Sequence, residues 1–159
     1  MRYCAYHPID VVNGPGTRCT LFVTGCEHQC PGCYNKSTWS FARGLEFDQE
    51  MEDQVLKDLG SVTVPRRGIS LTGGDPLHPR NLPAILKLVQ RVRLELPKKD
   101  IWCWTGYSFE TLTEEQLQVV KLLDCLIDGK FVKALADPSL PWRGSSNQNV
   151  INLKEKLLC

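Results

Sequence analysis

The segment TLFVTGCEHQCPGC, residues 20–33, joins a strand pattern to three closely spaced cysteines. Its first five residues are apolar or β-branched and lead into a glycine, which predicts a buried strand. The eight residues that follow place Cys26, Cys30 and Cys33 in one loop. The predicted strand therefore ends directly in a group of potential metal ligands.

The remaining sequence alternates strand and helix patterns, which predicts right-handed crossovers and a parallel sheet. A complete eight-stranded barrel takes about 250 residues, whereas this chain has 159. We therefore expect one α/β domain over residues 1–159, built as a partial (β/α) barrel or an open parallel sheet with helices on its outer face. The predicted strands are 20–24, 69–72, 101–104, 125–128 and 150–153, and the predicted helices are 48–59, 81–96 and 113–123.

Each candidate motif comes directly after a predicted strand. Parallel α/β sheets bind their ligands at the carboxyl ends of the strands. We therefore expect these loops to meet at one edge of the sheet. They are Gly25-Cys26, Gly73-Gly74-Asp75-Pro76, Thr105-Gly106 and Asp128-Gly129-Lys130.

The composition is that of a soluble globular protein, with 42% apolar and 23% charged residues. A net charge of +1 gives no basic field for nucleic acid. No apolar run approaches the roughly 20 residues of a membrane helix, and the first residues lack the apolar core of a signal peptide. We expect a cytoplasmic protein that binds neither nucleic acid nor membrane.

The cysteine triplet admits three interpretations. A structural zinc site takes four ligands, commonly as two pairs, and His28 as a fourth ligand would lie awkwardly inside the loop. A redox Cys-x-x-Cys pair would leave Cys26 unexplained. A 4Fe-4S cluster on three thiolates leaves one iron free to bind a small molecule. We favour this open-site cluster, with zinc or another structural metal, or no metal, as alternatives.

The other five cysteines are scattered along the chain. We interpret them as small buried apolar residues or as incidental thiols. They are Cys4, Cys19, Cys103, Cys125 and Cys159.

Two further strand-end motifs carry charge. Gly73 and Gly74 allow a ligand to approach the backbone closely, and the carboxylate of Asp75 could accept hydrogen bonds from an ammonium group. The alternative is an ordinary strand-to-helix turn. For Asp128 and Lys130 the alternative is a surface ion pair.

Together these motifs resemble the radical S-adenosylmethionine superfamily. The resemblance rests on Cys-x-x-x-Cys-x-x-Cys after the first strand and Gly-Gly-Asp-Pro after the second. It is closer to the glycyl-radical activating enzymes, and closest to those that act on anaerobic ribonucleoside-triphosphate reductase. It covers nearly the whole chain in order and implies a single radical-S-adenosylmethionine domain over residues 1–159. Further supporting segments are 13–18, 104–107, 128–131 and 142–148.

The resemblance also implies a mechanism. Cys26, Cys30 and Cys33 would hold one 4Fe-4S cluster, and the amino and carboxylate groups of S-adenosyl-L-methionine would chelate its fourth iron. A one-electron donor, for which the family suggests a flavodoxin-like protein, would reduce the cluster. Cleavage of the cofactor would give methionine and a 5′-deoxyadenosyl radical. That radical would take a hydrogen atom from a glycine in the large subunit of the reductase.

Cofactor-binding residues follow from the same resemblance. Gly73, Gly74 and Asp75 match the loop that meets the methionine amino group, with aspartate in place of the usual glutamate. Gly32 stands where the superfamily often has an aromatic residue near the adenine, which leaves Tyr34 for that contact.

Asp128 and Lys130 resemble an Asp-x-Lys feature near the cofactor carboxylate. An open side of the fold would admit the glycine loop of a large partner, and we expect residues 13–18 and 143–148 to frame this entrance. The alternative functions are a non-catalytic iron–sulfur electron-transfer module, a zinc-binding interaction protein, and a radical enzyme with another substrate.

Overall fold

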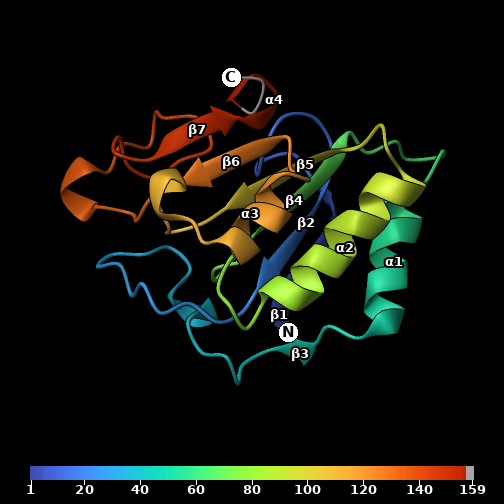
Figure 1. The fold of residues 1–159 in the computed structure, drawn as a ribbon, viewed down its shortest axis with the longest axis horizontal. Coiled ribbons are helices and arrows are strands. Elements are labelled where there is room, and N and C mark those ends of the chain that lie inside the picture. Colours follow the sequence, from blue (N-terminus) through green and yellow to red (C-terminus); the bar gives the residue numbers. More distant parts are fainter. Residues whose placement is uncertain (157–159) are drawn as a thin grey trace.

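The computed structural model describes residues 1–156 and contains one seven-stranded sheet with helices packed on one face (Figure 1). The strands lie in the order β3-β1-β2-β4-β5-β6-β7. An open α/β sheet is therefore confirmed. The strands are β1 (Arg2–Asp10), β2 (Arg18–Val23), β3 (Leu45–Glu46), β4 (Gly68–Gly73), β5 (Asp100–Trp104), β6 (Cys125–Asp128) and β7 (Asn149–Asn152).

The four central strands β2, β4, β5 and β6 are parallel, whereas β1, β3 and β7 add to the edges in antiparallel orientation. The five predicted strands are all present. The antiparallel direction of β7 was not expected. It arises because residues 129–148, which connect β6 to β7, contain only a short 3₁₀ turn and no crossover helix.

Three helices cover one face of the sheet (Figure 1). They are α1 (Gln49–Leu59), α2 (Leu82–Glu95) and α3 (Glu114–Val120), and a single turn, α4 (Leu153–Lys156), follows β7. α1 begins at Asp48, whose side chain accepts from the amide of Met51. α3 begins with the predicted capping box, in which Thr113 and Gln116 exchange side-chain-to-backbone hydrogen bonds.

The main core lies between these helices and the sheet. On α2 the side chains of Ile85, Leu88, Val89 and Val92 are fully buried, whereas Leu86 is partly buried against the core. On the opposite face a second, smaller cluster forms around the Trp102 ring. Trp142, from the segment 129–148, packs edge-on against the Trp102 ring of this cluster.

No helix among the described residues is long and apolar enough to cross a membrane.

The amino ends of the central strands are closed by a buried arginine. Arg18 has no exposed side-chain surface, and its guanidinium lies 2.6 Å from Asp100 and donates to Ser70 at 2.8 Å. The prediction that residues 13–18 frame the partner entrance is therefore wrong. The turn that joins antiparallel β1 and β2 lies at the amino end of β2, opposite the edge that carries the cysteines.

This arrangement predicts unequal effects of replacing two arginines that contact the same carboxylate. Arg18→Met should lower the free energy of unfolding by about 3–5 kcal/mol, because it removes the buried partner of the Asp100 carboxylate and leaves it the exposed Arg67. Arg67→Met should lower it by less than about 1 kcal/mol, because Arg67 contacts Asp100 from a side chain that is 60% exposed. Urea titration of anaerobically prepared protein measures both. Equal losses would contradict this account of the amino ends.

Candidate functional site

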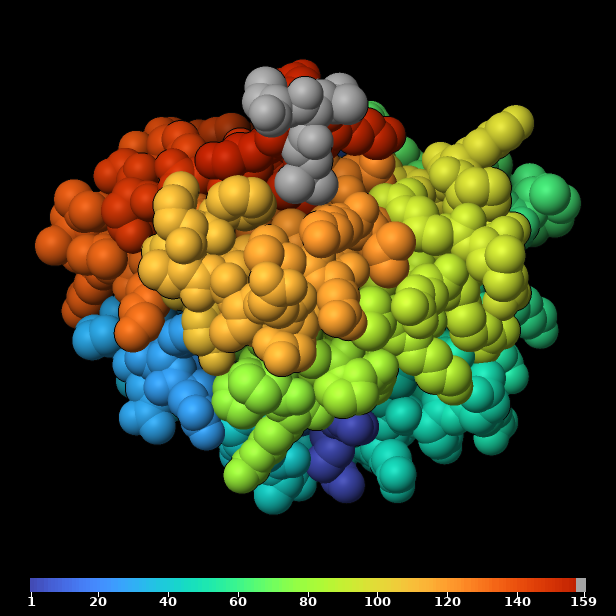
Figure 2. Space-filling view, viewed as in Figure 1, coloured from blue at the N-terminus to red at the C-terminus, as the bar shows by residue number. Residues whose placement is uncertain are grey.

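The loops that follow β2, β4, β5 and β6 meet around one cavity of about 150 Å³. The strand-end motifs therefore converge, as their positions predict. The cysteine loop lies at the surface, next to the segment after β6 (Figure 2). Residues of the predicted motifs that line the cavity are Cys26, Cys30, Cys33, Gly73, Gly74, Thr105, Gly106 and Gly129.

The cysteine loop and the glycine loop are joined through their backbones. The amide of Asp75 donates to the carbonyl of Gly25 at 2.9 Å, and the amide of Cys26 donates to the carbonyl of Trp39 at 3.0 Å. A Cβ atom at position 74 would come within 2.6 Å of the Gly25 oxygen. Gly74 is therefore required for this close approach.

The thiols of the loop differ in their surroundings. The pKa of the Cys26 thiol is raised to about 11, mainly by burial; the negative charge of Asp75 also raises it, and the backbone amides of His28 and Gln29 lower it. The sulfur of Cys33 accepts from the amide of Asn35 at 3.3 Å. Amide contacts to cysteine sulfur are among the interactions that tune iron–sulfur clusters.

The cysteine cavity fits an iron–sulfur cluster better than a single ion. A zinc ion needs every thiolate about 2.3 Å away, and no such group of three or more ligands occurs within residues 1–156. In a 4Fe-4S cluster each thiolate binds a different iron, so the sulfurs stand further apart. The three cysteines face one cavity, and its walls include four glycines.

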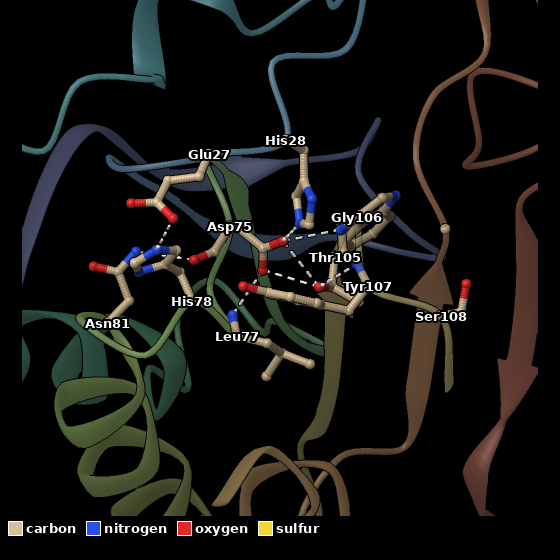
Figure 3. Close-up of polar contacts among 12 residues, drawn as sticks. Glu27, His28, Asp75, Leu77, His78, Asn81, Thr105, Gly106, Tyr107 and Ser108 are labelled. Atoms are coloured by element: carbon tan, nitrogen blue, oxygen red, sulfur yellow. Dashed lines mark hydrogen bonds and ion pairs between the residues drawn. The ribbon is translucent and has the colours of Figure 1, made fainter. Parts of the chain in front are cut away.

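Asp75 does not line the cavity; its side chain is only 1% exposed, and its carboxylate is directed toward Thr105 and Gly106 (Figure 3). It accepts from the hydroxyl of Thr105 at 2.9 Å and from the amides of Leu77 and Gly106 at 2.9 and 3.0 Å. Its second oxygen also lies 2.7 Å from Nε2 of His28. The structure thus brings the two preceding glycines to the cysteines, but it turns this carboxylate inward.

Asp128 and Lys130 line a neighbouring cavity of about 600 Å³ rather than the cysteine cavity itself. Asp128 is buried and accepts from the amide of Phe109 and the side chain of Asn149, both at 2.8 Å. The two cavities share His28. Asp128 therefore holds two loops together, while Lys130 is the cation that faces this second space.

Tyr34 lies on the rim of the cysteine cavity, 79% exposed, with its ring 5.7 Å from that of Phe131. The segment 143–148 contributes Gln148 to the same cavity, as the entrance prediction requires. Three aromatic residues that the sequence motifs had not assigned to the site also line the cysteine cavity: Trp39, Trp104 and Phe131. Trp104 and Phe131 adjoin predicted motifs and could have been found by that position, whereas no motif lies next to Trp39.

Comparison with known proteins agrees with this geometry. A family model described as "4Fe-4S single cluster domain" matches residues 12–151. The chain is 62% identical over 97% of its length to the full-length anaerobic ribonucleoside-triphosphate reductase-activating protein of Escherichia coli (strain K12). The protein of the same name from Vibrio cholerae is 60% identical, over 93% of this chain and 96% of that protein. The protein from Enterobacteria phage T4 is 47% identical, over 94% of this chain and 93% of that protein.

The fold and the cysteine loop thus define a 4Fe-4S domain. Within that class, the chain belongs to the family of anaerobic ribonucleoside-triphosphate reductase-activating proteins.

Four further cysteines, Cys4, Cys19, Cys103 and Cys125, do not line this cavity. Cys19, Cys103 and Cys125 are buried, in agreement with their interpretation as small apolar residues, and Cys4 is exposed on β1. Cys159 lies outside the described residues.

If the three loop cysteines are the cluster ligands, replacing any one of them should prevent cluster assembly, because each thiolate would hold a separate iron. Cys26→Ala, Cys30→Ala and Cys33→Ala are expected to lose the bound iron and sulfide and the visible absorbance after anaerobic reconstitution. Cys4→Ala is the matched control and should retain all three. Loss of the cluster in Cys4→Ala would show that the assigned ligand set is wrong.

Proposed function

We propose that this chain cleaves S-adenosyl-L-methionine reductively at a 4Fe-4S cluster held by Cys26, Cys30 and Cys33. The resulting radical then generates a glycyl radical on anaerobic ribonucleoside-triphosphate reductase. The observation that carries this proposal is the single cavity shared by three cysteines and the Gly73-Gly74 backbone. The names of the relatives support the choice of partner.

When bound, the reduced cluster supplies one electron to the sulfonium, which separates into methionine and a 5′-deoxyadenosyl radical. Three thiolates hold the cluster and leave one iron without a protein ligand. Gly73 and Gly74 present main-chain groups without side chains, so the amino group of the cofactor can be held against the cysteines. These groups would therefore hold the methionine end of the cofactor beside the cluster.

Two side chains complete the proposed cofactor site. The ammonium of Lys130 faces the neighbouring cavity and would pair with the cofactor carboxylate, while buried Asp128 fixes the loops around it. Tyr34 stands on the rim of the cysteine cavity and would provide the aromatic contact for the adenine. Because Tyr34 is largely exposed, that contact lies at the entrance.

A partner loop would reach the site at the carboxyl ends of the central strands. The helices cover one face of the sheet, so the cysteine loop remains at the surface (Figure 2). A glycine loop of the large reductase subunit would enter there, and a hydrogen atom would move from its Cα to the 5′ carbon. The products are 5′-deoxyadenosine and the glycyl radical. The electron comes from an external one-electron donor, and we propose a flavodoxin-like protein for this role.

The proposal predicts two products under one set of conditions. Anaerobically reconstituted protein, reduced with dithionite in the presence of S-adenosyl-L-methionine, should release 5′-deoxyadenosine, measured by chromatography. With the purified reductase added, electron paramagnetic resonance should detect a glycyl radical on the reductase. Omitting the cofactor is the control and should abolish both signals.

The two readouts separate the competing functions. A stable cluster without 5′-deoxyadenosine would contradict catalysis and favour a non-catalytic electron-transfer or metal-binding module. 5′-Deoxyadenosine without a radical on the reductase would contradict the proposed partner.

A further inference from the structure

His28 is the most enclosed side chain between the first two loop cysteines. Its side chain is 11% exposed, whereas that of the preceding Glu27 is 70% exposed. Nε2 of His28 lies 2.7 Å from an oxygen of Asp75. In the tautomer that carries its proton on Nε2, His28 donates to this oxygen. This contact ties the cysteine loop to the residue that follows the two glycines (Figure 3).

The imidazole ring of His28 packs closely against Gly106 and Tyr107. A Cβ atom at position 106 would come within 2.3 Å of the His28 ring, so only a glycine leaves room for it. The Tyr107 ring contacts the imidazole edge-on, with the ring centroids 4.6 Å apart. The amide of Gly106 donates to the same oxygen of Asp75 that His28 reaches. The residues that surround the ring therefore follow the ends of two strands, Asp75 after β4 and Gly106 and Tyr107 after β5.

Asp75 is fixed independently of His28. Its carboxylate is held by the three donors described above, and its carbonyl accepts from the side chain of Asn81 at 2.9 Å. The side chain of Asn81 also donates to the carbonyl of Thr24 at 3.0 Å, which anchors it at the end of β2. Asp75 is thus the fixed member of the pair, and the cysteine loop is the part that the contact positions.

Few other contacts hold this part of the loop. Glu27 lies 3.3 Å from His78, but the exposure of its side chain makes the pair weak. The amide of Cys33 donates to the carbonyl of Cys30, which shapes the loop locally without attaching it to the sheet. Among the described side chains of residues 27–32, His28 provides the buried attachment to the sheet.

We propose that His28 is a positioning residue that holds the cysteine loop against Asp75, so that the open iron faces the Gly73-Gly74 backbone. The inference rests on the proposed function and deepens it. In this arrangement Asp75 orients the cluster loop and does not touch the cofactor. Losing the contact should leave the three thiolates in place but weaken S-adenosyl-L-methionine binding about 10- to 100-fold, the usual effect of removing an outer-shell partner.

The test compares full-length variants after anaerobic reconstitution, with iron content and the electron paramagnetic resonance spectrum of the reduced cluster as readouts. The cofactor concentration that produces half of the spectral change should rise about 10- to 100-fold in His28→Phe. Gly106→Ala should give the same shift, because it displaces the ring while keeping both partners. His28→Gln keeps a donor and should restore most of the affinity.

His7→Phe is the matched control, because His7 is exposed on β1, and it should behave as the unaltered chain. An unchanged response in His28→Phe would overturn the inference, and so would a His28→Gln variant no better than His28→Phe. If His28→Phe takes up no iron, the His28→Gln variant tests the positioning role instead. Normal iron and cofactor response in His28→Gln would support positioning by the hydrogen bond, and their loss would overturn it.

Failure of the proposed function gives a different result. If the unaltered chain shows no spectral change with S-adenosyl-L-methionine, the proposed function fails, and the inference about His28 fails with it. If the unaltered chain responds and His28→Phe responds equally, only the positioning role is overturned.

Discussion

The parallel pairing of β2 with β4 sets the geometry of the whole site. Val23 lies opposite Gly73, so both strands end at the same edge and their loops begin about 5 Å apart. The pairing continues beyond the strands, because the amide of Gly74 donates to the carbonyl of Val23 at 2.8 Å. The cysteines and the glycine backbone therefore face one cavity as a direct extension of the sheet. A shift in this register would separate the ligands from the surface that we propose for the cofactor.

Stability and function lie at opposite ends of the same strands. At the amino ends, Arg18 and Asp100 close the sheet in a buried ion pair. At the carboxyl ends, the buried carboxylates of Asp75 and Asp128 bind backbone and side-chain donors from neighbouring loops. These carboxylates act as fixed anchors, and the groups for which we propose contacts with the cluster or the cofactor are the loop thiols, the Gly73-Gly74 backbone, Tyr34 and Lys130. No residue of α1 to α4 lines either cavity among the described residues. A partner loop would need this opening.

The sequence predicted what depends on local pattern and missed what depends on distant partners. The central strands and the main helices follow from continuous apolar runs and from the capping box at Thr113. β1 was missed because it has many exposed residues, an internal Pro8 and no continuous apolar run, and beyond Tyr3 it pairs with β2 alone. The spacing of the three cysteines marked them as a candidate ligand set, and the structure places all three around one cavity. The inward turn of Asp75 and its contact with His28 could not, because the donors come from three loops far apart in sequence. Arg18 was misplaced for the same reason, since a turn motif does not show which end of the sheet it occupies.

The central claim is that three thiolates leave one iron open to S-adenosyl-L-methionine beside the Gly73-Gly74 backbone. Mössbauer spectra of isotope-enriched protein test this claim most directly, because they distinguish the individual irons of a cluster. Adding S-adenosyl-L-methionine should change the signal of one iron and leave the other three as they were. Four unchanged irons, in a protein with an intact cluster and saturating cofactor, would contradict the account.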